Sequence, residues 1–298
     1  MPVPFSSAGQ SAKPLLPRSR KPRVLVLGDR LKEEVPSLAR RIRKHLGDRV
    51  DFQGSDLARR WKPITSNPDL VVVLGGDGAV LAASHRLESR RVPVLGVNFG
   101  SVGFLAGVSP ERATQVLDEI LEGKGRCEDR AMMRAKVERG GKVLLDTHIL
   151  NEAVISRASR GRLISAGLVV DRRPVCTFRG DGVIISTATG STAYNLAAGG
   201  PILSPSLDAW VVTPIAPHML SARPIVLPGH RSALIHTEEA GMFTADGHQE
   251  FQLNAGDRIR VEASKRRFRL LVDADEGFYA RLRGKLHWGA TPGTTEIA

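Results

Sequence analysis

Short apolar runs alternate with helical patterns through the first 127 residues of the chain. Apolar runs at residues 23–28, 70–74 and 92–97 predict strands, because such runs are typical of strands that are buried in a parallel sheet. Residues 34–46 and 110–121 place their apolar side chains at helical spacing and predict helices. Strands that alternate with helices predict a parallel sheet with flanking helices.

The pattern changes after residue 129. Short strand candidates follow one another, separated by polar or glycine turns. They lie at residues 134–138, 143–145, 152–156, 168–170, 182–186 and 232–236. One helix, at residues 191–198, interrupts them, and residues 274–286 are compatible with another helix. We therefore expect an α/β N-terminal domain, with a parallel sheet and flanking helices, followed by a β-rich C-terminal domain.

These patterns divide the chain into four parts. Residues 1–21, rich in proline, serine and basic side chains, predict a disordered basic tail. The α/β domain takes residues 22–127, and the β-rich domain takes residues 128–273. We expect residues 274–298 to form a C-terminal segment that returns to the N-terminal domain.

The chain carries a formal net charge of +12, and much of the excess lies near its start. The first 45 residues hold eleven Lys or Arg and three Asp or Glu. A basic tail can contact nucleic acid, but no zinc motif and no aromatic–basic interleaving accompanies it, so we predict no specific nucleic-acid partner. We interpret the charge as a general attraction for polyphosphate ligands.

Composition also bears on the compartment. No apolar stretch approaches about 18 residues, which predicts no membrane span, and the N-terminus lacks an apolar signal core. Cys127 and Cys176 are the only two cysteines in the sequence, and they lack metal-ligand spacing. This usage suits a reducing compartment, so we expect a cytoplasmic protein with two buried thiols.

The most informative stretch, residues 70–78, reads Leu-Val-Val-Val-Leu-Gly-Gly-Asp-Gly. A buried strand ends at glycines, which let backbone amides approach a ligand, and a helical run follows at residues 79–88. A strand, a glycine turn and a helix N-terminus form an anion site, because free N–H groups and the helix dipole favour phosphate. Asp77 would repel phosphate unless it holds a metal ion or takes a proton from an attacking hydroxyl.

Two further glycine-rich segments follow. Residues 95–105 carry Gly100 and Gly103 after a strand, and both a tight turn and a ligand contact are compatible with this pattern. Residues 180–201 combine a strand, a Ser/Thr/Gly turn, a capped helix and Tyr194. That combination suits an adenosine or ribose-phosphate ligand, and a capped helix with small-residue packing is the alternative.

Asn151 and Glu152 stand side by side before a strand. An amide and a carboxylate can bind the two hydroxyls of a ribose, although two polar residues at a strand start are the simpler interpretation of the isolated pair. The usual phosphate loop, G-x-x-x-x-G-K-[ST], is absent, and neither a Ser-His-Asp set nor a zinc spacing can be identified. His248 follows Asp246 and Gly247 in a turn, where a solvated side chain is the default.

Taken in order, the motifs resemble those of the NAD kinase family. The resemblance extends from about residue 22 to residue 288. The matching segments are Gly75-Gly76-Asp77-Gly78, Asn98-x-Gly-x-x-Gly-Phe-Leu105, Asn151-Glu152, Thr189-Gly-Ser-Thr-Ala-Tyr-x-Leu-x-Ala-Gly-Gly-Pro201 and Pro217-His-x-Leu-Ser-x-Arg-Pro-Ile225. A loop like the first occurs also in diacylglycerol and sphingosine kinases and in phosphofructokinases, whereas the run at residues 189–201 is specific to NAD kinases.

The resemblance implies ATP- and Mg²⁺-dependent phosphorylation of the adenosine-ribose 2′-hydroxyl of NAD, giving NADP, at a site between the two domains. It implies that Asp77 is the general base and Gly78 its loop partner. The sequence itself shows no dedicated protein cage for the metal. The positions implied to contact nucleotide are Asn151, Glu152, Arg162, Arg179, Asp181, Thr192, Ala193, Tyr194, Asn195, Leu196, Ala197, Ala216 and His248. Family members are homodimers or homotetramers whose subunits share the ligand site.

Three positions depart from the family pattern. Ala79 stands where Thr is frequent, Ala82 where many bacterial members have Arg, and His248 where Gln is frequent. One phosphate or nucleotide contact is therefore absent or supplied elsewhere. The departures leave open a non-catalytic sensor of NAD or NADP. A lipid kinase would need an apolar pocket for acyl chains, whereas the segment at residues 189–201 is small and polar. A dehydrogenase would need G-x-G-x-x-G with an acidic residue further on, and the first glycine loop lacks that spacing.

Overall fold

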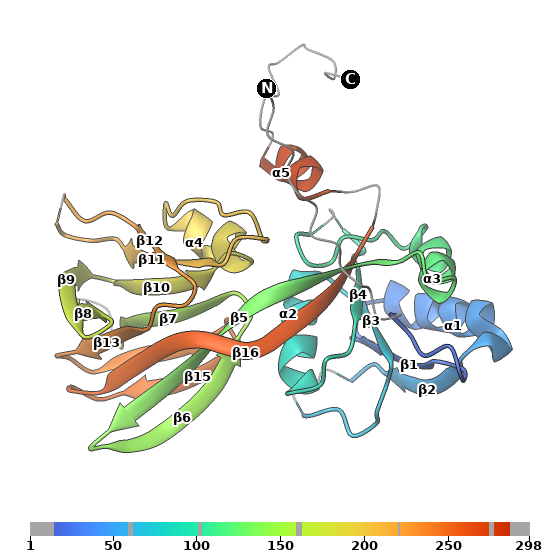
Figure 1. Cartoon of the computed structure of the whole chain (residues 1–298), viewed down its shortest axis with the longest axis horizontal. Coiled ribbons are helices and arrows are strands. Elements are labelled where there is room, and N and C mark those ends of the chain that lie inside the picture. Colours follow the sequence, from blue (N-terminus) through green and yellow to red (C-terminus); the bar gives the residue numbers. More distant parts are fainter. Residues whose placement is uncertain are drawn as a thin grey trace, which may run out of the picture.

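The computed structural model describes residues 15–58, 62–100, 103–158, 163–219, 221–273 and 277–286. The molecule has two lobes (Figure 1). The first lobe combines a parallel sheet with helices, and the second is built mainly from antiparallel strands, so the predicted fold class is confirmed. Arg162, one of the predicted site residues, lies outside the described residues.

The first lobe holds its parallel sheet between helices. Its elements are β1 (Arg23–Gly28), α1 (Glu34–Leu46), η1 (Gly47–Arg49), β2 (Asp51–Asp56), β3 (Leu70–Leu74), α2 (Asp77–Leu87), β4 (Val94–Val97) and α3 (Ala113–Leu121). Successive side chains of a strand point to opposite faces. Val24 and Val72 pack with α1 and α3 on one face, whereas Val71 and Val73 pack with α2 on the other. Because both faces are buried, the strands are continuous apolar runs.

The second lobe is made of antiparallel strands around one large core. Its elements are β5 (Arg126–Arg139), β6 (Lys142–Ile149), β7 (Glu152–Arg157), β8 (Ile164–Val170), β9 (Arg173–Gly180), β10 (Gly182–Thr187), η2 (Gly190–Thr192), α4 (Tyr194–Ala197), β11 (Ala209–Ile215), β12 (Ile225–Pro228), β13 (Ala233–Thr237), β14 (Gly241–Ala245), β15 (Gln249–Leu253) and β16 (Arg258–Val272). Six of them form a sheet in the order β12-β11-β10-β7-β14-β15. Its buried side chains, such as Ile155, Ile185 and Phe243, pack against those of β5, β8, β13 and β16.

Two long strands, β5 and β16, connect the lobes. They pair antiparallel along most of their length, and at the end of β16 Leu270 and Leu271 pair in parallel with Val94 and Leu95 of β4. One ten-stranded sheet therefore runs through both lobes, and Figure 1 shows the two strands crossing between them. The chain then ends its described part in α5 (Phe278–Leu286). The predicted domain boundary at residue 127 falls at the start of β5, and the division into domains stays a prediction.

Residues 15–21, which composition assigns to the basic tail, contact the first lobe. Leu16 is buried in the core that includes α1, and the Arg20 guanidinium forms a bidentate pair with Asp69, with oxygen distances of 2.6 and 2.9 Å. The same pair holds the pKa of the Asp69 carboxyl well below its usual range, against the opposing effect of burial. Residues 1–14 of the predicted tail lie outside the described residues, so their disorder stays a prediction.

Most predicted elements are present, with shifted ends. The helix expected at residues 191–198 is the short η2 followed by one turn of α4, and the helix expected at residues 110–121 begins at Ala113. The patterns missed β2, β9, β11, β12, β14, β15 and β16. Exposed edge strands such as β9 carry few buried side chains, and Pro214 interrupts the apolar run of β11, so hydrophobic periodicity is weak there.

Cys176 corrects one expectation. It lies exposed on β9, and Cys127 is only partly buried, so the prediction of two buried thiols is wrong. The reason is that β9 is an edge strand, whose outer residues have no neighbouring strand or helix to cover them. In the ranges that the structure describes, no helix is long and apolar enough to cross a membrane.

The position of Leu270 predicts a large loss of stability on truncation. Leu270 is completely buried where the sheet passes between the lobes, so we expect Leu270→Ala to lower the free energy of unfolding by about 2–5 kcal/mol. Urea denaturation followed by tryptophan fluorescence measures this. Leu207→Ala is the control, because Leu207 is 49% exposed, and its expected cost is about 0.5 kcal/mol. An equal loss of unfolding free energy in the two variants would contradict the stabilising role of Leu270 where β16 joins the lobes.

Candidate functional site

The two glycine segments of the first lobe meet at Asp77, the first residue of α2. Its Oδ2 accepts the N–H of Phe104 at 2.9 Å, and its Oδ1 accepts those of Leu105 at 3.0 Å and Ala106 at 2.9 Å. A Cβ on Gly103 would lie 1.9 Å from Asp77 Oδ1, so only glycine lets this segment reach the carboxylate. Since a carboxylate has about four lone-pair positions, three donors leave one for a further ligand or proton.

Helix α5 contacts the same loop from outside. Arg281 Nη1 donates to the carbonyl of Phe104 at 3.2 Å. The Phe104 ring lies 6.2 Å from the Phe278 ring, centroid to centroid, and the Lys285 ammonium is 5.3 Å from the Phe104 centroid. The C-terminal helix therefore supports the backbone that binds Asp77.

A cavity of about 300 Å³ lies beside the glycine turn, between the lobes. We call it the interlobe cavity. The first lobe contributes Lys32, Gly78, Ala79 and Ala82, and the turn between β14 and β15 contributes His248. Backbone N–H groups at the start of α2 and the Lys32 ammonium favour an anion here. All three departures from the family pattern therefore line this one cavity.

The second lobe uses a carboxylate in the same way. Asp246, whose side chain is completely buried, accepts the N–H groups of Leu150 at 2.8 Å, Asn151 at 2.7 Å and Glu152 at 3.1 Å. Its Oδ2 also lies 2.9 Å from His85 Nε2 on α2, a contact between the lobes. The sequence patterns missed both Asp246 and His85. An aspartate before glycine in a turn was the only local signal, and it is common in turns without such a role.

Buried polar atoms without partners gather at Asn151. Among the described residues, Asn151 Oδ1, Glu152 Oε2 and Thr189 Oγ1 have no hydrogen-bond partner. The segment at residues 189–201 lies close to Asn151, since a Cβ on Gly190 would be 2.3 Å from the Asn151 carbonyl oxygen and only glycine fits there. Buried polar atoms are almost always hydrogen-bonded, so these three indicate a place for a polar ligand.

Glu152 has a shifted ionisation. Burial, and after it the neighbouring charge of Asp246, raises the pKa of Glu152 from 4.5 to about 8. Near neutral pH its carboxyl is therefore mostly protonated, and it can donate a hydrogen bond as well as accept one.

Asn195 stabilises the segment at residues 189–201 from within. Its Nδ2 donates to the carbonyls of Ser191 and Pro201, both at 3.0 Å, and its Oδ1 accepts the Thr213 hydroxyl at 2.6 Å. The amide of this predicted contact residue is thus already engaged within the chain. Its predicted neighbours are partly or fully exposed: Thr192, Ala193, Tyr194, Leu196 and Ala197.

Arg179, Asp181 and Ala216 lie apart from the other predicted positions. Glu152 pairs with Ser186 at one end of β7 and β10, whereas Asp181 directly precedes the other end of β10. Arg179 and Ala216 lie at that same end, because the Asp181 N–H donates to the last residue of β11, which Ala216 follows. A single chain therefore presents two groups of candidate residues rather than one.

A carboxylate at a helix N-terminus that is bound by backbone amides, next to a cavity lined by a lysine, defines the class: an enzyme that acts on a phosphate-bearing substrate. Comparison with known proteins identifies the family within this class. The ATP-NAD kinase N-terminal domain matches residues 28–125, and the ATP-NAD kinase C-terminal domain matches residues 150–272. The chain belongs to the NAD kinase family, and it is a phosphotransferase.

Relatives cover most of the chain. The NAD kinase of Aromatoleum aromaticum is 41% identical over 245 residues, which are 82% of this chain and 82% of the relative. The NAD kinase of Azoarcus sp. is 42% identical over 250 residues, 83% of each. Among solved structures, yeast NADH kinase complexed with NADH has a TM-score of 0.83 at 23% identity, over 93% of this chain and 91% of that one. An NAD kinase from Archaeoglobus fulgidus in complex with ATP has a TM-score of 0.71 at 27% identity, over 89% and 97%.

The raised pKa of Glu152 predicts a pH-dependent stability. As pH rises from 4.5 towards about 8, the unfolded chain loses the Glu152 proton while the folded protein keeps it, so this contribution to stability is complete below pH 4.5 and is lost as pH rises through the folded pKa. Glu152→Gln has no proton to lose. We therefore expect the variant to gain stability relative to the wild type between about pH 5 and about pH 8.5.

Urea denaturation at both pH values measures the difference between the two proteins, in which other titrations cancel. Glu250→Gln, at an exposed position of β15, is the control and should differ from the wild type equally at both pH values. A Glu152→Gln difference that is independent of pH would contradict the shifted ionisation.

Proposed function

We propose that the protein transfers the γ-phosphate of ATP to the adenosine-ribose 2′-hydroxyl of NAD, giving NADP and ADP. The observation that carries this proposal is Asp77, which begins α2 beside the interlobe cavity with three of its lone-pair positions bound to backbone donors. Family membership supports the reaction, and the A. fulgidus relative is described in complex with ATP.

Asp77 acts as the general base in this mechanism. The ribose 2′-oxygen forms a bond to the γ-phosphorus, the bond from that phosphorus to the ADP oxygen breaks, and the hydroxyl proton passes to the carboxylate of Asp77. The N–H groups of residues 104–106 fix the carboxylate in one orientation. Such fixed orientation matters because a proton acceptor must lie within hydrogen-bond reach of the hydroxyl.

The phosphates of ATP bind in the interlobe cavity. The N–H groups at the start of α2 and the Lys32 ammonium provide positive charge. Ala82 provides no arginine here, although Arg86, which is paired with Asp56, also lines the cavity. The second lobe brings His248 to it. We assign His248 as a hydrogen-bond partner of a bound phosphate or nucleotide.

NAD binds along the second lobe. The unpartnered atoms of Asn151, Glu152 and Thr189 receive ribose hydroxyls or adenine nitrogens. The exposed side of the segment at residues 192–197, with the Tyr194 ring, covers the adenosine. Asn195 contributes by keeping this segment in shape, since its amide is engaged inside it.

Arg179, Asp181 and Ala216 belong to the site of a neighbouring subunit in this proposal. They lie at the far end of β10 from Glu152, so one chain cannot present them to the same ribose. A homodimer or homotetramer in which each subunit lends this end to its neighbour would complete the site. Arg162 stays a predicted contact.

Mg²⁺ would enter with ATP and supply positive charge that neutralises the phosphates. In the described part of the chain, no three His, Cys, Asp or Glu side chains are grouped to bind a metal ion. The residues present therefore fit a metal that would be held by the phosphate oxygens of ATP and by water, because the remaining lone-pair position of Asp77 is the one that accepts the hydroxyl proton.

Asp77→Asn tests the assigned base. We expect the variant to bind NAD as the wild type does and to lose about 10²- to 10⁴-fold in turnover, because the amide cannot accept the proton. The measurement is NADP formation from NAD, ATP and Mg²⁺. Asp48→Asn, at an exposed position of η1, is the control. Near-wild-type turnover of Asp77→Asn would remove Asp77 as the base. If the wild type binds NADP tightly but forms none, the sensor function is favoured.

Gly103 allows a second test of the same carboxylate. A methyl group at Gly103 collides with Asp77 Oδ1, whereas nothing lies within 4 Å of a Cβ on Gly100. We expect Gly103→Ala to reduce NADP formation about 100-fold, because a displacement of about 1 Å misplaces the base. Gly100→Ala should keep full activity, and both variants should keep the melting temperature within a few degrees. Equal activity of the two variants would argue against the contact.

A further inference from the structure

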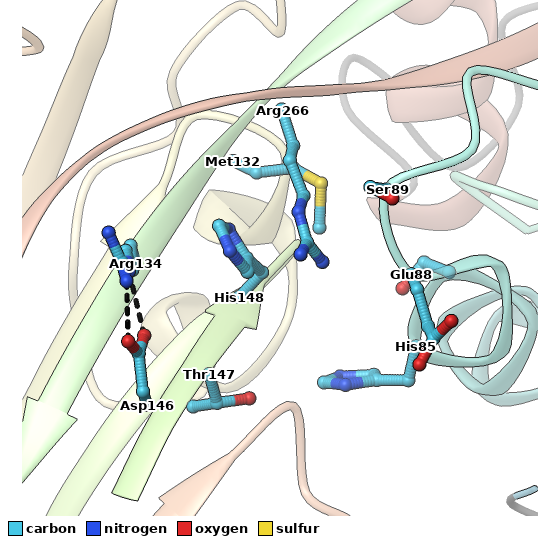
Figure 2. A pocket seen from close by; sticks show the side chains of 10 residues that line it. His85, Glu88, Ser89, Met132, Arg134, Asp146, Thr147, His148 and Arg266 are labelled. Atoms are coloured by element: carbon cyan, nitrogen blue, oxygen red, sulfur yellow. Dashed lines mark hydrogen bonds and ion pairs between the residues drawn. The ribbon is translucent and has the colours of Figure 1, made fainter. Parts of the chain in front are cut away.

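A second and larger cavity lies on another side of α2. Its volume is about 580 Å³, and it shares no lining residue with the interlobe cavity. One wall is the end of α2, with His85 and Glu88, and the other is formed by β5, β6 and β16 (Figure 2). We call it the strand cavity. None of the nucleotide positions that the sequence predicts lies in it.

An irregularity of β16 shapes this cavity. The pairing of β16 with β5 shifts between Ala263 and Arg267, which marks a bulge. Ser264 Oγ accepts the N–H of Arg266 at 2.9 Å and lies 2.7 Å from His148 Nδ1. Bulges re-aim side chains and are frequent beside functional sites. Figure 2 shows the result: Arg266 points into the space between the strands and α2, with the His148 ring beside it.

The strand cavity contains a cation without a carboxylate partner. Among the described residues, Arg266 forms no ion pair, although Glu88 and Asp146 also line the cavity. Asp146 is bound instead by Nε and Nη2 of Arg134, so Nη1 of Arg134 is still able to donate to another acceptor. An incoming anion interacts favourably with an unpaired guanidinium that is partly withdrawn from water.

His148 responds to this positive charge. Burial first, then the charges of Arg266 and Arg134, lower the pKa of His148 from 6.5 to about 4, and only Asp146 opposes them. His85 adds to the lowering. The groups that face His148 are therefore mainly cationic, although Glu88 stands on the opposite wall. When the Ser264 hydroxyl donates to Nδ1, the neutral ring carries its proton on Nε2, which can donate to a ligand.

We propose that the strand cavity is a second anion site, which binds a small phosphate-bearing molecule through Arg266, Nη1 of Arg134 and Nε2 of His148. The volume accommodates more than inorganic phosphate, so the ligand is a pyrophosphate-like anion or the phosphate end of an organic phosphomonoester. This site is separate from the one assigned to ATP and NAD, and the proposal holds whether or not the protein forms NADP.

The test is ¹H–¹⁵N NMR of the histidine rings in the full chain, titrated with sodium pyrophosphate. His148→Asn assigns the His148 signal. We expect pyrophosphate at about 1 mM to move this signal and to raise the pKa of His148 by about 1 or more, since an anion within contact distance favours the charged ring. Binding in the interlobe cavity is reported separately, by the signal of His248.

Arg266→Gln should weaken the binding that His148 reports about ten-fold or more, because the charged partner is lost. Arg267→Gln is the matched control: it removes the same charge from the next residue of the bulge, which lines a different, smaller cavity, and it should bind as the wild type does. Glycerol 2-phosphate distinguishes the two sources, since a response to it as well as to pyrophosphate identifies an organic phosphate ligand.

Two outcomes would overturn the proposal. One is a His148 signal that stays unchanged up to about 10 mM of either anion. The other is equal affinity in Arg266→Gln and the wild type. Because pyrophosphate binding at His148 is measured without NAD or ATP, neither outcome depends on whether NADP is formed.

Discussion

The antiparallel pairing of β5 with β16 is the constraint on which the rest of the molecule depends. The two strands leave the core of the second lobe and enter the sheet of the first, where β16 continues onto β4. Because backbone groups in a buried ladder need their partners, the lobes cannot separate without breaking this sheet. The interlobe cavity consequently has two fixed walls, α2 and the turn between β14 and β15, and the contact of His85 with Asp246 joins them.

Two aspartates organise the site by the same means. Asp77 binds three successive amides of the first lobe, and Asp246 binds three successive amides of the second. Each carboxylate therefore fixes a loop that has no regular hydrogen-bond ladder. Their consequences differ: the first keeps a proton acceptor in place, while the second places negative charge beside Glu152 and raises the pKa of that residue.

Hydrophobic periodicity predicted the first lobe well, since strands buried on both faces are continuous apolar runs. It was weaker in the second lobe. The exposed edge strand β9 is stabilised mainly by pairing with β8, and in β16 charged residues stand among the buried apolar ones, so neither strand shows a clear hydrophobic pattern. The same limit applies to the site. Local pattern singled out Asp77, Asn151 and Glu152, but it had no means of finding His85 or Asp246, whose importance comes from residues more than ninety positions away.

The sequence by itself determined the class of fold, the order of the motifs and the family, because glycines, an aspartate and polar pairs at set spacings are visible without coordinates. The tertiary structure decided which of these residues meet. It showed that Gly103 is needed beside Asp77, that Asn195 is engaged within its own segment, and that Arg179 and Asp181 lie at the far end of β10 from Glu152. The physical reason is that strand pairing and side-chain packing join distant parts of the chain, and hydrogen bonds between them depend on distances that local spacing does not encode.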